Sequence, residues 1–161
     1  MQMVTVAIAD TNPERRAKIE QLLQEGPGIK VLTDILPEGA DKSVDDQYQH
    51  QAPDITIADI VQRIGRVKPR ILFTHLDPST EHDLVLLQAL HRECPDTLVL
   101  LLTDKSIGEE LIIEALAVGA RGCLSHEAEP FHFQKAVRLV DRGEIWVTRT
   151  MLGKIMDKVL H

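Results

Sequence analysis

The chain has 161 residues, of which 43% are hydrophobic and 27% charged, as in a single folded domain rather than a disordered chain. With 18 Lys and Arg against 25 Asp and Glu, the formal net charge is -7, which argues against direct nucleic-acid binding by this segment because a phosphate backbone requires a concentrated cationic face. Two cysteines are too few for a disulfide framework and no apolar run approaches membrane-spanning length, so we expect a cytoplasmic protein with no membrane span.

The N-terminal residues predict a strand followed by a helix. Residues 4–9 (VTVAIA) form an apolar strand that ends at Asp10. Asn12 followed by Pro13 is typical of a helix N-cap and the first helical position, and Gly26 marks the end of that helix.

A second strand and a long polar stretch follow. Residues 28–35 (GIKVLTDI) predict the strand. The stretch 37–53 is rich in acidic residues and long for a strand–helix connection, so we expect an inserted loop. Helical spacing of apolar residues returns at Ile57 and stops at Pro69.

The middle of the chain repeats the alternation. Residues 71–76 predict a short buried strand, and a helix begins near Thr80 and ends before Pro95. Residues 98–102 are five consecutive apolar residues, which is typical of a strand covered on both faces.

The C-terminal part adds further helices and one short strand. Ser106 begins a helix that ends at Gly119, Cys123 and Leu124 form a fifth strand, and a helix spans residues 130–143. One more helix covers 148–161, with Leu152, Ile155, Met156 and Val159 predicted on a single apolar face. We therefore divide the chain into a domain at 1–147 and a C-terminal helix at 148–161.

Five strands alternating with five helices predict an α/β fold, a doubly wound five-stranded parallel sheet with an extra C-terminal helix. In such sheets, functional side chains collect beyond the carboxyl ends of the strands. The residues that lie just past strands, or at their ends, are Asp10, His75, Thr103 and His126.

Two motifs resemble a known family. Residues 115–124 (ALAVGARGCL) and residues 143–146 (GEIW), followed by Arg149, resemble the CheY-like receiver domains of response regulators, in the subfamily that controls LuxR/NarL-type helix-turn-helix output domains. The resemblance covers most of the chain except 37–53. It implies a role in two-component signal transduction, a sensor kinase as a partner, and a covalently linked helix-turn-helix output domain in the parent protein, with 148–161 as the start of the linker.

The resemblance also implies a phosphorylation site, from which this sequence departs. In the family, two acidic residues after the first strand hold Mg²⁺, an Asp after the third accepts a phosphoryl group, and a Thr or Ser and a Lys bind its oxygens. The corresponding residues here are Ala9 and Asp10 for the acidic pair, His75 for the acceptor, Thr103, His126 for the Lys, and Cys123 for the aromatic switch residue. One carboxylate binds Mg²⁺ weakly and a neutral imidazole does not replace an ammonium, so we expect the conventional phosphorylation to be lost.

Two other carboxylates offer an alternative. A shift of two residues would make Asp77 the phosphoacceptor, and Asp104 directly follows Thr103. We favour loop-capping roles for both, since the shift would lengthen the segment between Pro69 and the acceptor.

A metal site is another alternative, in which the domain senses a ligand or a metal. Asp10, His75 and His126 provide an oxygen and two imidazoles, which suit Zn²⁺ or a related transition metal. We favour two partly exposed histidines in a redundant pocket, with no cofactor required. Cys123 and Cys94 are expected to be small buried residues rather than nucleophiles.

The interpretation we favour is a degenerate receiver domain: a regulatory module, not an enzyme. It would act through protein contacts and self-association. The apolar stripes of 130–142 and 148–159 predict part of a homodimer contact.

Overall fold

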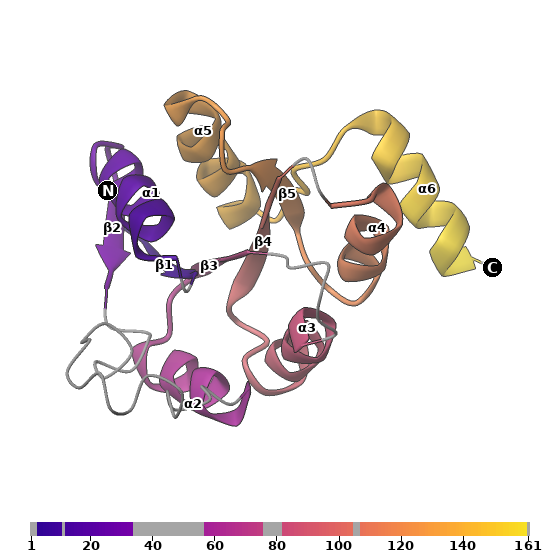
Figure 1. Ribbon diagram of the computed structural model, residues 1–161, viewed down its shortest axis with the longest axis horizontal. Helices are drawn as coiled ribbons and strands as arrows, with labels where there is room; N and C mark the ends of the chain where they lie inside the picture. Colours follow the sequence, from indigo (N-terminus) through magenta and orange to yellow (C-terminus); the bar gives the residue numbers. More distant parts are fainter. Residues whose placement is uncertain (1–2, 11, 34–56, 76–81, 105–106, 161) are drawn as a thin grey trace, which may run out of the picture.

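A five-stranded parallel sheet forms the centre of the protein (Figure 1). The structure is a computed structural model that describes residues 3–10, 12–33, 57–75, 82–104 and 107–160. The strands are β1 (Val4–Ala9), β2 (Ile29–Leu32), β3 (Ile71–His75), β4 (Leu98–Thr103) and β5 (Gly122–Ser125). Their order is β2-β1-β3-β4-β5, and every pairing is parallel. The predicted doubly wound sheet is confirmed.

Helices cover both faces of this sheet (Figure 1). One face carries α1 (Pro13–Gln24) and α5 (Pro130–Asp141). The other carries α2 (Ile57–Val67), α3 (His82–Glu93) and α4 (Glu109–Ala117), and α6 (Arg149–Leu160) lies outside α4. The extra C-terminal helix is therefore present.

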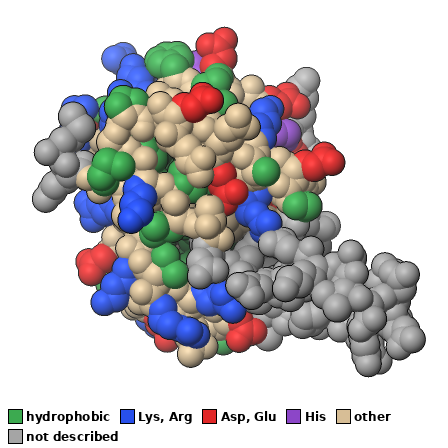
Figure 2. Space-filling view, turned by 90° about the vertical axis from the view of Figure 1, so that its left-hand side faces the viewer, with side chains coloured by type: hydrophobic (Ala, Val, Ile, Leu, Met, Phe, Trp, Pro, Cys, Tyr) green, Lys and Arg blue, Asp and Glu red, His purple; other side chains and the backbone are tan. Residues whose placement is uncertain are grey.

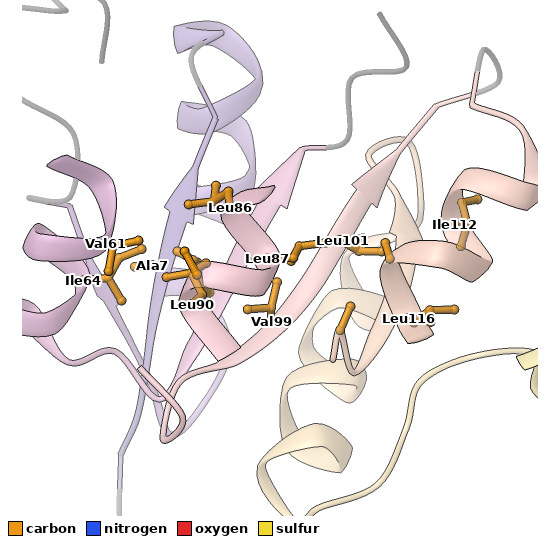
Figure 3. Packing of buried hydrophobic residues seen from close by; sticks show 14 of the residues in the cluster. Ala7, Val61, Ile64, Leu86, Leu87, Leu90, Val99, Leu101, Ile112 and Leu116 are labelled. Atoms are coloured by element: carbon orange, nitrogen blue, oxygen red, sulfur yellow. The ribbon is translucent and has the colours of Figure 1, made fainter. Parts of the chain in front are cut away.

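The alternation of side chains along the strands divides the core into two layers. Ala7, Leu72, Val99 and Leu101 point towards α2, α3 and α4, where they pack against residues such as Ile64 (Figure 3). On the opposite face the strands bury a second cluster with α1 and α5, which includes Val6, Ile8, Ile19, Phe73, Leu100, Leu102, Phe133 and Val137. Burial on both faces explains why β3 begins with three consecutive apolar residues and β4 with five.

The helix and strand boundaries agree closely with the expectations from the sequence. Asn12 is the N-cap of α1, with Pro13 at its first position. The second strand, expected over 28–35, is shorter in the structure and spans Ile29–Leu32. The stretch 37–53 and the helix starts expected at Thr80 and Ser106 lie outside the described residues.

The segment after α5 runs along the outer edge of β5. The Trp146 backbone N–H donates to the Arg121 carbonyl at 2.9 Å, and the Cys123 N–H donates to the Trp146 carbonyl at 3.1 Å. These bonds form a parallel bridge between Gly122 and Trp146. They occupy backbone groups that an edge strand would otherwise expose, and they explain how the two sequence motifs meet.

The C-terminal helix α6 packs on α4. Met151 and Ile155 are partly buried against the core layer that contains α4. Lys154 pairs with Glu109, and the Lys158 ammonium lies 3.8 Å from the Glu114 carboxylate. The docked face is therefore both apolar and charge-matched.

The prediction that the apolar residues of this helix share a single face was wrong for Ile155. Ile155 faces the domain, whereas Leu152, Met156 and Val159 are exposed. Residues at i, i+4 and i+7 share one side of a helix, so these three form a stripe that points outward.

The surface carries charges of both signs. On the side that bears α1 and β2, acidic and basic side chains are interspersed (Figure 2). In the part of the chain that the structure describes, no helix has the length and apolarity needed to cross a membrane.

Candidate functional site

The carboxyl ends of four strands bring the predicted site residues to one edge of the sheet. Asp10 directly follows β1, His75 ends β3, Thr103 ends β4 and His126 directly follows β5. Because the strands are adjacent in the order β1-β3-β4-β5, these residues line one continuous edge. The side chains decide which of them interact.

Asp10 is buried, with 2% of its surface exposed, and both oxygens of its carboxylate accept hydrogen bonds. The Arg15 guanidinium donates to it twice, from Nε to Oδ2 and from Nη2 to Oδ1, the latter at 2.8 Å. The Asn12 backbone N–H adds a third bond to Oδ1 at 2.9 Å. The carboxylate is thus held by a bidentate, charge-assisted pair and a backbone donor.

Arg15 was not foreseen as a site residue. It lies in the first turn of α1, where Asn12 Oδ1 accepts from its backbone N–H at 3.0 Å. A cation in this turn is unfavourable to the helix dipole, which attracts anions there. This unfavourable placement of a cation was the sequence signal for Arg15, because it indicates that a nearby carboxylate compensates the charge.

The environment of Arg15 favours the protonated form of its guanidinium. Hydrogen bonding to Asp10 raises the pKa of the Arg15 guanidinium, partial burial lowers it, and the charges of Asp10 and Asp104 raise it further. Two carboxylates therefore influence the Arg15 guanidinium electrostatically: that of Asp10, which follows β1, and that of Asp104, which follows β4.

His75 lies beside the second of these carboxylates. Its Nε2 atom is 3.6 Å from Asp104 Oδ2, and its side chain is 15% exposed. That nitrogen is buried and has no hydrogen-bond partner among the described residues. The two groups form an ion pair only when the imidazole is protonated.

The two imidazoles approach one another without completing the predicted metal set. The His75 and His126 ring centroids are 6.3 Å apart. In the described part of the chain, however, no group of three or more His, Cys, Asp or Glu side chains is placed to hold a metal ion. Asp10, the third predicted ligand, directs its oxygens to Arg15 and Asn12 instead.

Thr103 turns its hydroxyl towards the neighbouring strand. Its Oγ1 donates to the Leu124 carbonyl of β5 at 3.3 Å, and the residue is buried. The His126 backbone N–H in turn donates to the Thr103 carbonyl at 3.0 Å. Both hydrogen bonds connect the end of β4 to the end of β5.

Cys123, at the switch position, is half-buried, and burial raises the pKa of its thiol. A raised pKa disfavours the thiolate, the nucleophilic form. Cys94 behaves similarly, because burial and the charge of Glu93 both raise its pKa. Asp77, the alternative phosphoacceptor, lies outside the described residues.

The Mg²⁺ that the receiver resemblance implies does not fit the residues as they are arranged. Mg²⁺ requires oxygen ligands in near-octahedral geometry. The one acidic residue directly after β1 already accepts three hydrogen bonds, two of them from a guanidinium whose charge repels a cation. Paired in this way, Asp10 is not available as an Mg²⁺ ligand.

Comparison with known proteins gives matches in structure only. No protein-family model matches the chain, and no curated protein matches it in sequence. A LuxR family DNA-binding response regulator from Silicibacter pomeroyi superposes with a TM-score of 0.64 at 22% identity, over 92% of this chain and 99% of that one.

Two structures of RcsB from Salmonella superpose as well. The isolated REC domain from Salmonella enterica serovar Typhimurium, solved with the phosphomimetic BeF3-, gives a TM-score of 0.66 at 13% identity over 96% of this chain and 99% of that one. A longer Salmonella typhimurium RcsB chain, solved to study DNA interaction, gives 0.68 at 15% identity over 99% of this chain and 68% of that one. At these identities the comparisons show that the chain has the receiver fold.

Proposed function

We propose that this chain is an atypical receiver domain of a LuxR-type response regulator, which controls its output through protein contacts rather than aspartyl phosphorylation. Its fold is that of receiver domains, including those of DNA-binding response regulators. The proposal makes it a cytoplasmic regulatory module rather than an enzyme.

The observation that carries the proposal is the pairing of Asp10 with Arg15. An aspartyl phosphate needs a carboxylate acceptor and a divalent cation close by. Here the carboxylate after β1 is engaged by a guanidinium, and the residue that ends β3 is a histidine whose Nε2 is buried. The proposal is supported by these two features, since Asp10 is paired where the family uses a metal ligand and His75 stands where the family has its acceptor Asp.

A route from this edge of the sheet to the C-terminal helix supports regulation by contact. The loop that leaves β4 after Thr103 leads into α4, and α6 packs on α4. Met151 and Ile155 supply the apolar part of this contact, and the exposed pairs Lys154–Glu109 and Lys158–Glu114 add a weaker electrostatic part. A shift of α4 would therefore move α6.

The partners follow from the same arrangement. The outward stripe of Leu152, Met156 and Val159 is suited to a second copy of this chain, because two such stripes cover each other's apolar surface. A helix-turn-helix domain in the parent protein would then receive the signal through α6. In this proposal a sensor kinase is not required as a phosphoryl donor.

The test is phosphate uptake by the wild-type protein. After incubation with a small-molecule phosphodonor and Mg²⁺, intact-mass measurement should show no adduct. The Asp77→Asn and His75→Ala variants serve as matched controls for the alternative acceptors. A stoichiometric adduct on the wild type that either substitution abolishes would contradict the proposal and favour a phosphorylatable receiver.

A further inference from the structure

We propose that Arg15 is a built-in counter-cation: its guanidinium supplies the positive charge that a divalent cation supplies in phosphorylatable receivers, and it keeps the pocket closed to Mg²⁺. The inference rests on the proposed function and deepens it.

The first step is that both oxygens of the Asp10 carboxylate already accept hydrogen bonds. Its side chain is 1% exposed, and it accepts from Arg15 Nε, Arg15 Nη2 and the Asn12 backbone. A carboxylate so deeply buried requires a compensating charge, since an isolated one is strongly destabilising. Arg15 provides that charge within the same short segment of chain.

The second step is the position of Arg15 relative to another carboxylate. Asp104 follows β4, and its negative charge acts on Arg15 together with that of Asp10. Asp104 also lies 3.6 Å from the His75 imidazole. The Arg15 guanidinium thus bonds Asp10 directly and is also influenced by the charge of Asp104, so one side-chain cation offsets negative charge that follows two strands.

The third step is exclusion. A divalent ion bound to Asp10 would have to displace the guanidinium, because two cations on one carboxylate repel each other. It would also have to replace three hydrogen bonds from donors fixed by α1 and its N-terminus. Without Arg15, the Asp10 carboxylate would lose its compensating cation from α1, and hard oxygen ligands of this kind favour Mg²⁺ or Mn²⁺.

The experiment compares divalent-cation binding by three proteins in the absence of any phosphodonor. They are the wild type, Arg15→Gln, and Lys18→Gln, in which the same charge is removed from an exposed position of α1. Mn²⁺ affinity is measured by calorimetric titration, and the unfolding temperature is measured with and without Mg²⁺ at constant ionic strength.

We expect Arg15→Gln to bind Mn²⁺ at least about tenfold more tightly than the wild type and Lys18→Gln, and to gain thermal stability from Mg²⁺. Adding Asp10→Asn to Arg15→Gln should abolish both the tighter Mn²⁺ binding and the stabilisation by Mg²⁺. Equal affinity in all three proteins, or no binding by Arg15→Gln, would overturn the inference.

If Arg15→Gln does not fold alone, its refolding from urea is followed with and without millimolar Mg²⁺. Recovery only with Mg²⁺ supports the inference, and failure under both conditions contradicts it. These outcomes are independent of phosphate uptake by the wild type, so failure of the proposed function is recognised separately.

Discussion

The Trp146 backbone lies so close to Gly122 that a Cβ atom at position 122 would be 2.5 Å from the Trp146 carbonyl oxygen. It would also be 2.8 Å from the Trp146 Cβ atom. Only glycine allows the segment after α5 to pair with the edge of β5. The glycine of one sequence motif is therefore required by the position of the backbone at residue 146 in the other motif.

We expect Gly122→Ala to destabilise the fold by about 2–3 kcal/mol, because overpacking forces the backbone of either β5 or Trp146 to shift. Urea unfolding measures the loss. Gly65→Ala, in α2 with no atom within 4 Å of the added Cβ, is the control and should stabilise the protein by about 0.5–1 kcal/mol. Equal effects of the two substitutions would show that the contact with Trp146 is unimportant.

The N-cap of α1 makes a second contribution. Asn12→Ala removes the acceptor for the Arg15 backbone N–H and should lower stability by about 1 kcal/mol. Asn12→Ser keeps a capping oxygen and should recover most of that loss. Thermal unfolding of the two variants distinguishes capping from a general effect of the substitution.

Removing Arg15 should be more costly than removing the cap. Arg15→Ala leaves the Asp10 carboxylate buried without its charge partner, and we expect a loss of about 3 kcal/mol in free energy of unfolding. The double variant with Asp10→Ala should lose less than the sum of the two single variants, as a double-mutant cycle by urea unfolding would reveal. Strict additivity would mean that the pair is not coupled.

The cysteines should react slowly in the folded protein. Burial raises the pKa of the Cys123 thiol, so the thiolate is scarcer near neutral pH than in the unfolded chain. By linkage, this thiol lowers stability as pH rises above its ordinary pKa, because the unfolded state ionises first. Iodoacetamide labelling followed by peptide mass analysis should be slow without urea and fast with it. Rapid labelling of Cys123 in the folded state would contradict this.

The outward stripe of α6 should support self-association. Light scattering over a concentration series should show a dimer for the wild type, and Leu152→Ser with Met156→Ser should shift it towards monomer. Val85→Ser, at another exposed apolar residue, on α3, should leave the equilibrium unchanged. A wild-type protein that is monomeric at high concentration would exclude this surface as a dimer contact.

The sequence by itself determined the order and nature of the elements. Asn12 and Pro13 began α1 where expected, and the apolar run at 98–102 became strand β4, which lies between β3 and β5. These signals are local: a cap, a proline or a repeat of apolar residues acts within a few residues of the chain. Strand ends follow from them, so Asp10 and His75 could be placed at the edge of the sheet.

Only the tertiary structure decided what those residues do. In the structure the Asp10 carboxylate accepts from Arg15, and the Thr103 hydroxyl donates to the β5 backbone. His75 lies 3.6 Å from Asp104, and the predicted metal ligands are not assembled. It also divided the apolar residues of α6 between a docked and an exposed face. The pattern of apolar residues in a strand determines where along the sheet a residue lies. Its direction and partner depend on neighbours from other strands and helices, because buried polar groups adopt the rotamers that satisfy their hydrogen bonds.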